Sequence, residues 1–225
     1  MIALGLFKDQ ADIDNSPRQD FGNYLPGDIK YKDVNGDGIV NWDDIVPLKY
    51  SYVPQIQYGF ATEFNWKNFN VSVLFEGVSR VTYFKGGNMY QPFSGSTVGN
   101  VITDFANPAN RWISREISGD PATENPNAKY PRLYYGGSSN NSQSSSFWLS
   151  DGSYLRLKNV TLGYTLPAAW SKKAAMSSVR FFVSGQNLLT LTRYTGLDPE
   201  ISGSGNDNNV YPVARNITFG ASVSF

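Results

Sequence analysis

One stretch of the sequence has the oxygen-rich spacing of a calcium-binding loop. Residues 33–44 read Asp-Val-Asn-Gly-Asp-Gly-Ile-Val-Asn-Trp-Asp-Asp, which matches a D-x-[DN]-x-[DN]-G loop closed by a carboxylate at its twelfth position. Calcium (Ca2+) prefers hard oxygen ligands wrapped closely around it, and this spacing supplies them. The predicted ligands are the backbone carbonyl of Ile39 and the side chains of Asp33, Asn35, Asp37, Asn41 and Asp44.

The loop departs from its template at the closing position. Asp44 stands where loops of the EF-hand type carry Glu, and the flanking sequence predicts no pair of helices, so a calcium sensor is not expected. Gly38 permits the sharp turn that the template needs. The alternative is an Asn-Gly, Asp-Gly turn that binds no ion. If calcium binds, its predicted role is structural.

Other carboxylates give a weaker indication of chemistry. Glu63 and Glu76 lie in alternating segments, and Asp198 and Glu200 are two residues apart, so a glycosidase-type pair can be imagined. The sequence gives no sign of their separation in space, and solvated or lumen-facing charges account for them. The chain has no His and no Cys, which removes the commonest general base and zinc ligands. We therefore predict no enzyme and no catalytic residue.

Aromatic residues are frequent between the predicted strands. Aromatic faces can stack on sugar rings or receive a partner protein, although in loops they more often pack a small local core. The candidate ligand or partner contacts are Tyr90, Trp112, Tyr134, Tyr135 and Trp148, in a wider set that includes Tyr83, Phe84, Phe93 and Phe147. Both interpretations stay open from the sequence.

Alternating apolar and polar residues predict the strands that must position these groups. The clearest pair is 56–64 and 69–76, joined by a link so short that it forces an antiparallel hairpin. The segments 154–166, 179–189 and 217–225 alternate in the same way. A weaker strand near 3–7 brings the total to about six.

Short and long links take turns along the chain. The short ones are 65–68 and 167–178, the second with one helical turn predicted at 168–173 after Pro167, and the long ones are 8–53, 81–153 and 192–214. This separation is typical of outer-membrane barrels, which have tight periplasmic turns and long extracellular loops. Segment 136–146 is rich in Gly, Asn and Ser and is predicted to bury little and to be mobile. Alternation alone also fits a soluble sandwich.

Composition excludes some classes of protein. The 225 residues carry a net charge of zero with scattered Lys and Arg, so nucleic acid is not an expected partner. The sequence contains no run of about 18 apolar residues that could form a membrane-spanning helix. The opening segment Met1–Phe7 lacks a basic start and a cleavage site, so any signal peptide is expected upstream.

Several stretches in a fixed order resemble the SusC/RagA family of TonB-dependent outer-membrane transporters. They cover essentially the whole chain, and the region that they resemble is the C-terminal part of the family's barrel. The stretches are Gly5–Gln10, Ile13–Asp14, Pro26–Gly38, Asn125–Arg132, Tyr154–Tyr164, Val183–Thr190, Gly196–Glu200 and Tyr211–Arg215. The terminal Phe225 is also similar to the last residue of outer-membrane proteins.

The resemblance implies an all-β fold, in which antiparallel up-and-down strands form a segment of a large transmembrane β-barrel over residues 1–225. Residues 33–44 would then lie in a long extracellular loop. The family's plug domain and TonB-contacting segment precede the matching region and are absent from this chain. About six strands cannot close around a lumen for which such transporters use about 22.

The resemblance also implies a function, which is import of oligosaccharides or peptides across the outer membrane of a Gram-negative bacterium. The implied partners are a SusD-like surface lipoprotein that acts as a lid, outer-membrane lipid, and TonB through the missing N-terminal part. The alternative is a soluble, calcium-bearing, carbohydrate-binding β-sandwich module.

Overall fold

The computed structural model describes residues 1–87, 90–93, 101–200 and 211–225, and the chain divides into two compact units. The first, here called the sheet unit, comprises the described residues of 50–82, 151–200 and 211–225. The second, here called the loop unit, comprises those of 1–49 and 83–150.

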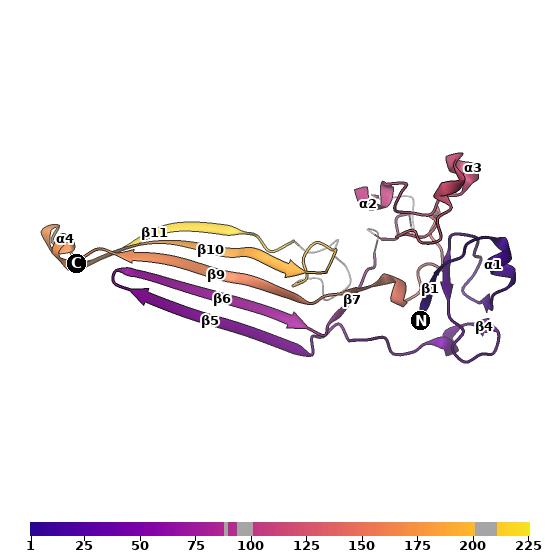
Figure 1. Cartoon of the computed structure of the whole chain (residues 1–225), viewed down its shortest axis with the longest axis horizontal. Coiled ribbons are helices and arrows are strands. Elements are labelled where there is room, and N and C mark those ends of the chain that lie inside the picture. Colours follow the sequence, from indigo (N-terminus) through magenta and orange to yellow (C-terminus); the bar gives the residue numbers. More distant parts are fainter. Residues whose placement is uncertain (88–89, 94–100, 201–210) are drawn as a thin grey trace. The chain divides into compact units, whose positions relative to one another are not determined.

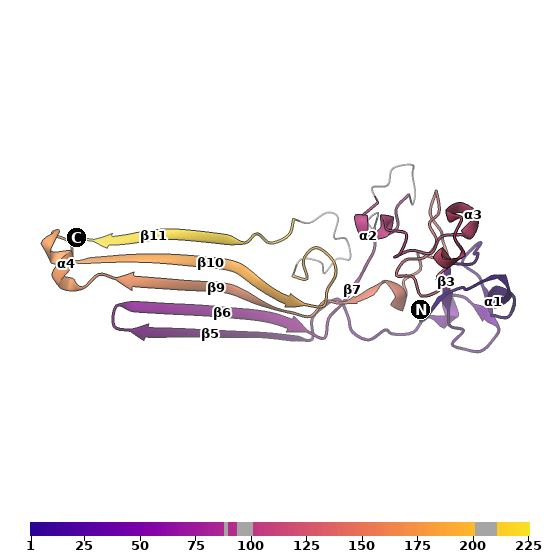
Figure 2. The same cartoon turned by 45° about the horizontal axis from the view of Figure 1, so that its top comes forward.

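Five long strands form the sheet unit. They are β5 (Ile56–Trp66), β6 (Phe69–Ser79), β9 (Tyr154–Thr165), β10 (Ser178–Thr192) and β11 (Asn216–Ser224). Their order in the sheet is β5-β6-β9-β10-β11, and every neighbouring pair is antiparallel, so the strands run up and down (Figures 1 and 2). The predicted strands of this sheet are confirmed.

The short links lie together at one end of the sheet, here called the turn end. Lys67 and Asn68 join β5 to β6, and the link from β9 to β10 carries α4 (Ala168–Lys173). Phe69 pairs with Tyr164, and Tyr164 pairs with Phe181, so the two links are neighbours (Figure 1). Links 80–153 and 193–215 leave from the opposite end, here called the loop end. The predicted separation is confirmed for the short links 65–68 and 167–178 and the long links 81–153 and 192–214, whereas residues 8–53 do not join two strands of this sheet.

A bulge in β9 keeps the apolar residues of that strand on one face. The pairing with β6 shifts between Leu74, opposite Asn159, and Phe75, opposite Leu157, so Lys158 is an extra residue. One extra residue reverses which side chains face each side of a strand. Leu157 and Val160 therefore share a face although they are three residues apart.

The loop unit is built from short elements around one apolar core. Its strands and helical turns are β1 (Ala3–Leu6), β2 (Arg18–Gln19), β3 (Ile29–Tyr31), β4 (Ile39–Val40), α1 (Gln10–Asp14), α2 (Thr103–Ala106), α3 (Arg115–Ser118), η1 (Trp42–Asp44), η2 (Pro121–Thr123) and η3 (Ser146–Trp148). The paired strands β7 (Thr82–Phe84) and β8 (Leu149–Asp151) lie mostly in this unit, and each has one terminal residue, Thr82 or Asp151, in the sheet unit. Its core contains Leu6, Phe21, Ile29, Phe105 and Trp148 among other buried residues. No helix in the described part of the chain is long and apolar enough to cross a membrane.

Two sequence predictions fail in the loop unit. The strand predicted near 3–7 exists as β1, but it pairs with β3 in a separate two-stranded sheet because Leu6 and its partner Ile29 are buried in the loop core. The sheet therefore has five strands and not about six among the described residues. Segment 136–146 is not the poorly buried stretch predicted, since Asn140, Asn141 and Ser145 are buried within it.

The two asparagines of that segment hold the loop unit together by hydrogen bonds to the backbone of β3. The Ile29 N–H donates to Asn141 Oδ1 at 2.9 Å, and Asn140 Nδ2 donates to the Ile29 carbonyl at 2.9 Å. Gln19 Nε2 donates to Asn140 Oδ1 at 2.6 Å, which extends the network. Buried polar groups must find such partners, and here side-chain amides replace a neighbouring strand.

Candidate functional site

The sheet has one continuous apolar face. Cross-strand registers align the side chains of successive strands in rows, of which Val73, Val160, Gly185 and Ile217 form the middle one. The face comprises Ile56, Tyr58, Phe60, Thr62, Phe64 and Trp66 of β5, Phe69, Val71, Val73, Phe75 and Gly77 of β6, Leu155, Leu157, Val160, Leu162 and Tyr164 of β9, Val179, Phe181, Val183, Gly185, Leu189 and Leu191 of β10, and Ile217, Phe219, Ala221 and Val223 of β11. This set contains no charged residue.

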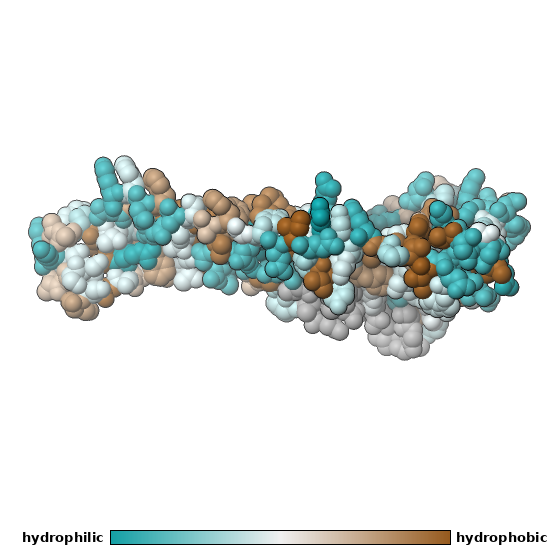
Figure 3. Space-filling model, turned by 90° about the horizontal axis from the view of Figure 1, so that it is seen from below, coloured by the Kyte–Doolittle hydropathy of each residue, from teal (hydrophilic) through white to brown (hydrophobic). Residues whose placement is uncertain are grey.

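Many of these side chains are open to the surroundings. Phe219 is 80% exposed and Ile217 is 64% exposed, and Figure 3 shows hydrophobic residues at the surface along the sheet. Soluble monomers rarely expose apolar patches of more than a few hundred Å². A sandwich would cover this face with a second large sheet, but the other sheets in the described residues have two strands each. The face is therefore a large apolar surface that is open in the described part of the chain.

The opposite face is polar and internally hydrogen-bonded. Thr161 Oγ1 lies 3.0 Å from Asn159 Oδ1 on the same strand and 3.0 Å from Ser184 Oγ on the adjacent strand β10. The Arg180 guanidinium donates to Asn70 Oδ1 at 3.1 Å. Glu63, one of the carboxylates noted in the sequence, faces the same side in the alternation of β5. One apolar and one polar face on the same long strands is the pattern of a barrel wall around an aqueous lumen.

A buried ion-pair cluster lies toward the loop end of the polar face. Arg156, with a side chain only 3% exposed, lies 2.7 Å from Asp198 Oδ1 and 2.7 Å from Glu200 Oε2. Lys158 Nζ approaches Glu200 at 2.5 Å and Glu76 at 3.9 Å. Asp198 also accepts the Val213 N–H at 3.1 Å. The ion pairs therefore bind Asp198 and Glu200 to cations of β9, and Asp198 also holds Val213, so a structural role accounts for both carboxylates.

Segment 33–44 folds into a loop stabilised by its own side chains. Asp33 accepts the N–H groups of Gly36 and Gly38 at 2.7 and 2.9 Å. Asn35 Oδ1 accepts the Asp37 N–H at 2.9 Å, and Asp37 Oδ1 accepts the Ile39 N–H at 2.8 Å. Asn41 caps η1 by accepting the Asp43 N–H at 2.6 Å. Each predicted ligand side chain of this part therefore points at backbone within the loop.

Asp44 is the closing residue of this loop and is fully buried. Its Oδ2 accepts the Asn41 N–H at 2.9 Å, and its Oδ1 accepts the N–H groups of Val34 and Asn35 at 2.6 and 3.3 Å. Burial alone would raise the pKa of Asp44, but these three hydrogen bonds outweigh it and hold the pKa below its ordinary range. Asp44 is therefore ionised at neutral pH, as a calcium ligand must be.

The described residues contain no group of three acidic side chains close enough to hold a metal. The calcium template differs from such a group because it also uses the oxygens of Asn35, Asn41 and Ile39. Asp44 Oδ2 accepts one hydrogen bond and keeps a second lone pair for an ion. The residue types fit calcium, and calcium binding stays a prediction.

Titration of calcium into the folded protein is expected to give a saturable heat that Asp37→Asn weakens by about tenfold or more, since ligand charge sets the affinity of such loops. Asn keeps an oxygen to accept the Ile39 N–H, so the loop can keep its fold. The matched control is Asp43→Asn, because Asp43 is exposed and outside the predicted ligand set. Absence of calcium heat in the unmodified protein would end the assignment.

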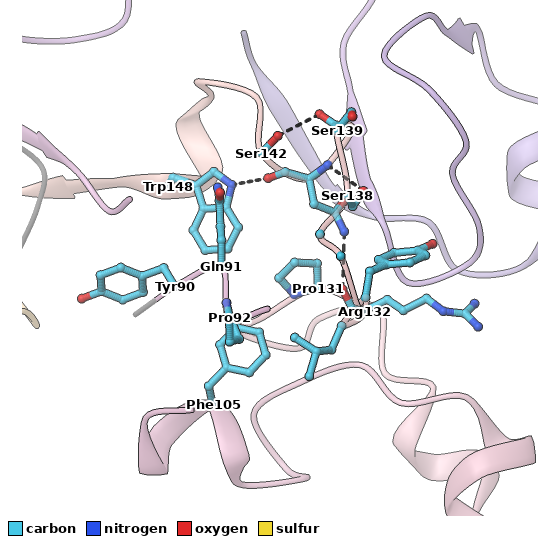
Figure 4. Close-up of a pocket in the computed structure, with 15 residues that line it drawn as sticks. Tyr90, Gln91, Pro92, Phe105, Pro131, Arg132, Ser138, Ser139, Ser142 and Trp148 are labelled. Atoms are coloured by element: carbon cyan, nitrogen blue, oxygen red, sulfur yellow. Dashed lines mark hydrogen bonds between the residues drawn. The ribbon is translucent and has the colours of Figure 1, made fainter. Parts of the chain in front are cut away.

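Three of the five candidate aromatic residues meet in the loop unit. Tyr90, Tyr134 and Trp148 line a pocket of about 190 Å³, together with backbone and hydroxyl groups of Ser138 and Ser139 (Figure 4). The Trp148 indole N–H donates to the Asn141 carbonyl at 2.7 Å, which fixes the ring at the pocket wall (Figure 4). The pocket is thus a serine-lined hollow with Trp148 held in one wall.

The other candidate aromatics lie outside this pocket. Trp112 is buried beneath Gly27, with the Arg132 guanidinium 5.2 Å from its ring centroid. Tyr135 is exposed and lies 6.3 Å from Phe93. Of the wider set, Tyr83 is buried, and Phe84 and Phe147 pack against the loop core. Ligand contact by Tyr90, Tyr134 or Trp148 stays a prediction.

A buried carboxylate supports one wall of the pocket. Asp28 Oδ2 accepts the Tyr134 hydroxyl at 2.6 Å and the Leu25 N–H at 2.8 Å, and Asp28 Oδ1 accepts Asn141 Nδ2 at 2.7 Å. Burial raises the pKa of Asp28, although these hydrogen bonds and the charge of Arg132 counteract the rise. Burial and the bond to Asp28 raise the pKa of Tyr134 as well, so its hydroxyl stays protonated and donates.

Sequence reasoning missed Arg156, Asn140 and Asn141. Arg156 falls in a strand whose alternation was recognised, but its partners lie 42 and 44 residues later. The asparagines fall in a segment whose composition is typical of disorder. An arginine on the polar face of a strand, with an Asp-x-Glu sequence in the next long loop, was the only local signal for the ion-pair cluster.

Comparison with known proteins extends these observations. The chain is 32% identical over 234 residues to TonB-dependent receptor P26 of Formosa agariphila, a match that covers 99% of this chain and 22% of the receptor. It is 28% identical over 209 residues to TonB-dependent receptor SusC of Bacteroides thetaiotaomicron, a match that covers 90% of this chain and 18% of SusC. No family model matches the chain.

Solved structures give the same result. The RagAB peptide transporter is 27% identical, with a TM-score of 0.59 and coverage of 78% of this chain and 18% of that one. The closed-closed state of the RagAB peptide importer aligns with all of this chain at a TM-score of 0.67 and 21% identity, which shows the fold alone. The chain spans 18% to 22% of the length of these relatives.

The fold and the two faces of the sheet define a segment of a β-barrel wall. The chain is a homologue of TonB-dependent receptors, similar over nearly its whole length to a portion of them, and its resemblance to the SusC/RagA type is confirmed. These relatives are named receptors and importers, in agreement with the prediction that the chain is not an enzyme.

Proposed function

We propose that this chain forms part of the barrel wall of a TonB-dependent importer in the outer membrane of a Gram-negative bacterium. The observation that carries the proposal is the pair of faces on one antiparallel sheet. The apolar face, which includes the exposed Phe219 and Ile217, faces lipid, and the face with Thr161 and Ser184 lines the lumen. Alternation of lipid-facing and lumen-facing residues is the rule in such barrels.

The links give the orientation of the segment. Short turns are periplasmic and long loops extracellular in outer-membrane barrels. The turn end with α4 is therefore on the periplasmic side. Because the connection that precedes β5 enters at the loop end, we infer that residues 33–44 lie on the extracellular side.

The cargo is an oligosaccharide or a peptide, captured with a SusD-like surface lipoprotein and moved with energy from TonB. Hydroxyl and amide groups such as Ser184 and Asn159 offer both donors and acceptors, which suits sugar hydroxyls and peptide backbone. The similarity of this chain to the RagAB peptide transporter favours a peptide as the cargo.

Two adjacent residues of β11 test the lipid-facing assignment. Ile217 lies in the middle row of the apolar face, and Thr218 is the next residue on the opposite face. In the full-length protein that contains this chain, Ile217→Lys is expected to lower the free energy of unfolding from the membrane by about 2–4 kcal/mol, the cost of a cation near the bilayer midplane. Thr218→Lys is expected to leave it nearly unchanged.

Heat-modifiable migration of the assembled barrel and denaturant unfolding in lipid vesicles would measure the difference. For a soluble module, Ile217→Lys is expected to be the better tolerated of the two variants, because replacing an exposed Ile by Lys improves contact with water. Equal tolerance of both variants would therefore contradict the proposal.

A further inference from the structure

The turn end carries exposed lysines beside exposed tryptophans. Lys67 and Trp66 lie at the β5–β6 turn, and Trp170, Lys172 and Lys173 lie in α4 of the neighbouring turn. The segments 64–70, 165–179 and 220–225, which make up this end, contain no Asp or Glu. These five residues are called the turn-end set below.

Trp66 continues the apolar face to its edge. Trp66 is the last residue of that face on β5 and is 55% exposed, and its cross-strand partner Phe69 lies 4.6 Å from Tyr164 between ring centroids. Lys67 Nζ lies 4.8 Å from the Trp66 ring centroid. A ring at the margin of an apolar surface with a cation above it is the arrangement that suits a membrane–water interface.

The lysines of the set differ from the cations at the loop end. Arg156 and Lys158 are bound to Asp198 and Glu200. In the part of the chain that the structure describes, Lys67, Lys172 and Lys173 form no ion pair. Arg180 also lies near this end, but it donates to Asn70 on the polar face and is therefore not part of the turn-end set. The turn end therefore presents three unneutralised ammonium groups.

We propose that the turn-end set binds the phosphate groups of anionic phospholipids in the leaflet that it faces. The proposal rests on the proposed function, because it needs the apolar face to lie in a bilayer. Trp66 and Trp170 set the depth at the headgroup region, as aromatic side chains do at interfaces. The three lysines then lie at the level of lipid phosphates, where each contributes about a fivefold preference for anionic lipid, equivalent to about 1 kcal/mol.

A protein with an acidic surface is the other partner that such a cationic end could receive. Lipid is favoured because Lys67 directly follows Trp66, which is at once the last residue of the apolar face on β5 and a member of the turn-end set. A protein contact would not need the tryptophan at the edge of that face. The experiment below separates the two partners.

The test compares lipid selectivity in the full-length protein reconstituted into phosphatidylcholine vesicles. Spin-labelled phosphatidylglycerol and spin-labelled phosphatidylcholine report how strongly each lipid associates with the barrel. The unmodified protein is expected to prefer phosphatidylglycerol, with a preference that falls as salt is added, since salt screens exposed charges. The triple variant Lys67→Gln, Lys172→Gln, Lys173→Gln is expected to lose about fivefold of that preference for each lysine that contacts lipid phosphate.

The matched control is Lys8→Gln with Lys32→Gln, two exposed lysines of the loop unit. It is expected to keep the preference. If the triple variant keeps it too, the lysines do not bind lipid and the inference is wrong, with an acidic protein as the remaining partner. If neither spin-labelled lipid is immobilised by the unmodified protein, no apolar face lies in the bilayer, and the proposed function fails together with the inference.

Discussion

Replacing Arg156 by Met is expected to lower the free energy of unfolding by about 3–5 kcal/mol. Arg156 and Asp198 form an ion pair in which both side chains are almost fully buried. Removing the guanidinium leaves the Asp198 carboxylate buried without its cation, and that uncompensated charge is the main cost. Glu200, which is partly exposed, loses a partner too but keeps Lys158.

Denaturant unfolding of the full-length protein in detergent or vesicles measures this effect. Lys158→Met is the control, because Lys158 and Glu200 are each more than a fifth exposed, and such pairs contribute at most about 1 kcal/mol. The double variant Arg156→Met with Asp198→Asn is expected to recover much of the loss, since it removes both charges and keeps an acceptor for the Val213 N–H. Equal effects of the two single variants would show that burial of the Arg156 pair is unimportant.

Replacing Gly27 by Ala is expected to destabilise the loop unit by about 3–5 kcal/mol. A Cβ at Gly27 would lie 2.2 Å from Cδ2 and 2.4 Å from Cε3 of the Trp112 ring, far inside contact distance. Gly27 also has a φ of +91°, which side chains rarely adopt. The Gly27 N–H donates to the Phe7 carbonyl and the Gly27 carbonyl accepts the Arg132 N–H, so the backbone cannot move away freely.

Gly136→Ala separates the two causes. Gly136 has a similar φ of +88°, but a Cβ there meets nothing within 4 Å. It is therefore expected to cost only the backbone strain, on the order of 1–2 kcal/mol. Limited proteolysis of the loop unit, with rates compared among the unmodified protein and both variants, gives the readout. A Gly27→Ala variant that resists protease as well as Gly136→Ala does would contradict the close packing of Trp112.

Local patterns in the sequence predicted the sheet and its two faces well. Side chains of a strand alternate between two faces, so the residues around Phe60, Val73 and Phe219 revealed an apolar and a polar side without knowledge of their neighbours. Link length is equally local, because two residues such as Lys67 and Asn68 can join only adjacent antiparallel strands. These features follow from short-range geometry.

The sequence predicted the candidate site less completely. Its calcium template named residues 33–44, and the structure closes Asp44 onto the backbone of Val34 and Asn35 in a way that the template alone does not give. The aromatic candidates were recognised as a class. Which of them line a pocket depended on segments about 60 residues apart in sequence, as with Tyr90 and Trp148.

The sequence by itself thus determined a two-faced antiparallel sheet with short links at one end and an oxygen-rich loop. Tertiary structure alone decided the rest. It buried Asn140 and Asn141 against β3, which is more than a hundred residues away in sequence. It also paired β1 with β3 and made Lys158 the extra residue of a β-bulge. The reason is physical: alternation and link length act between neighbours, whereas a buried amide or ion pair exists only where distant segments supply its partner.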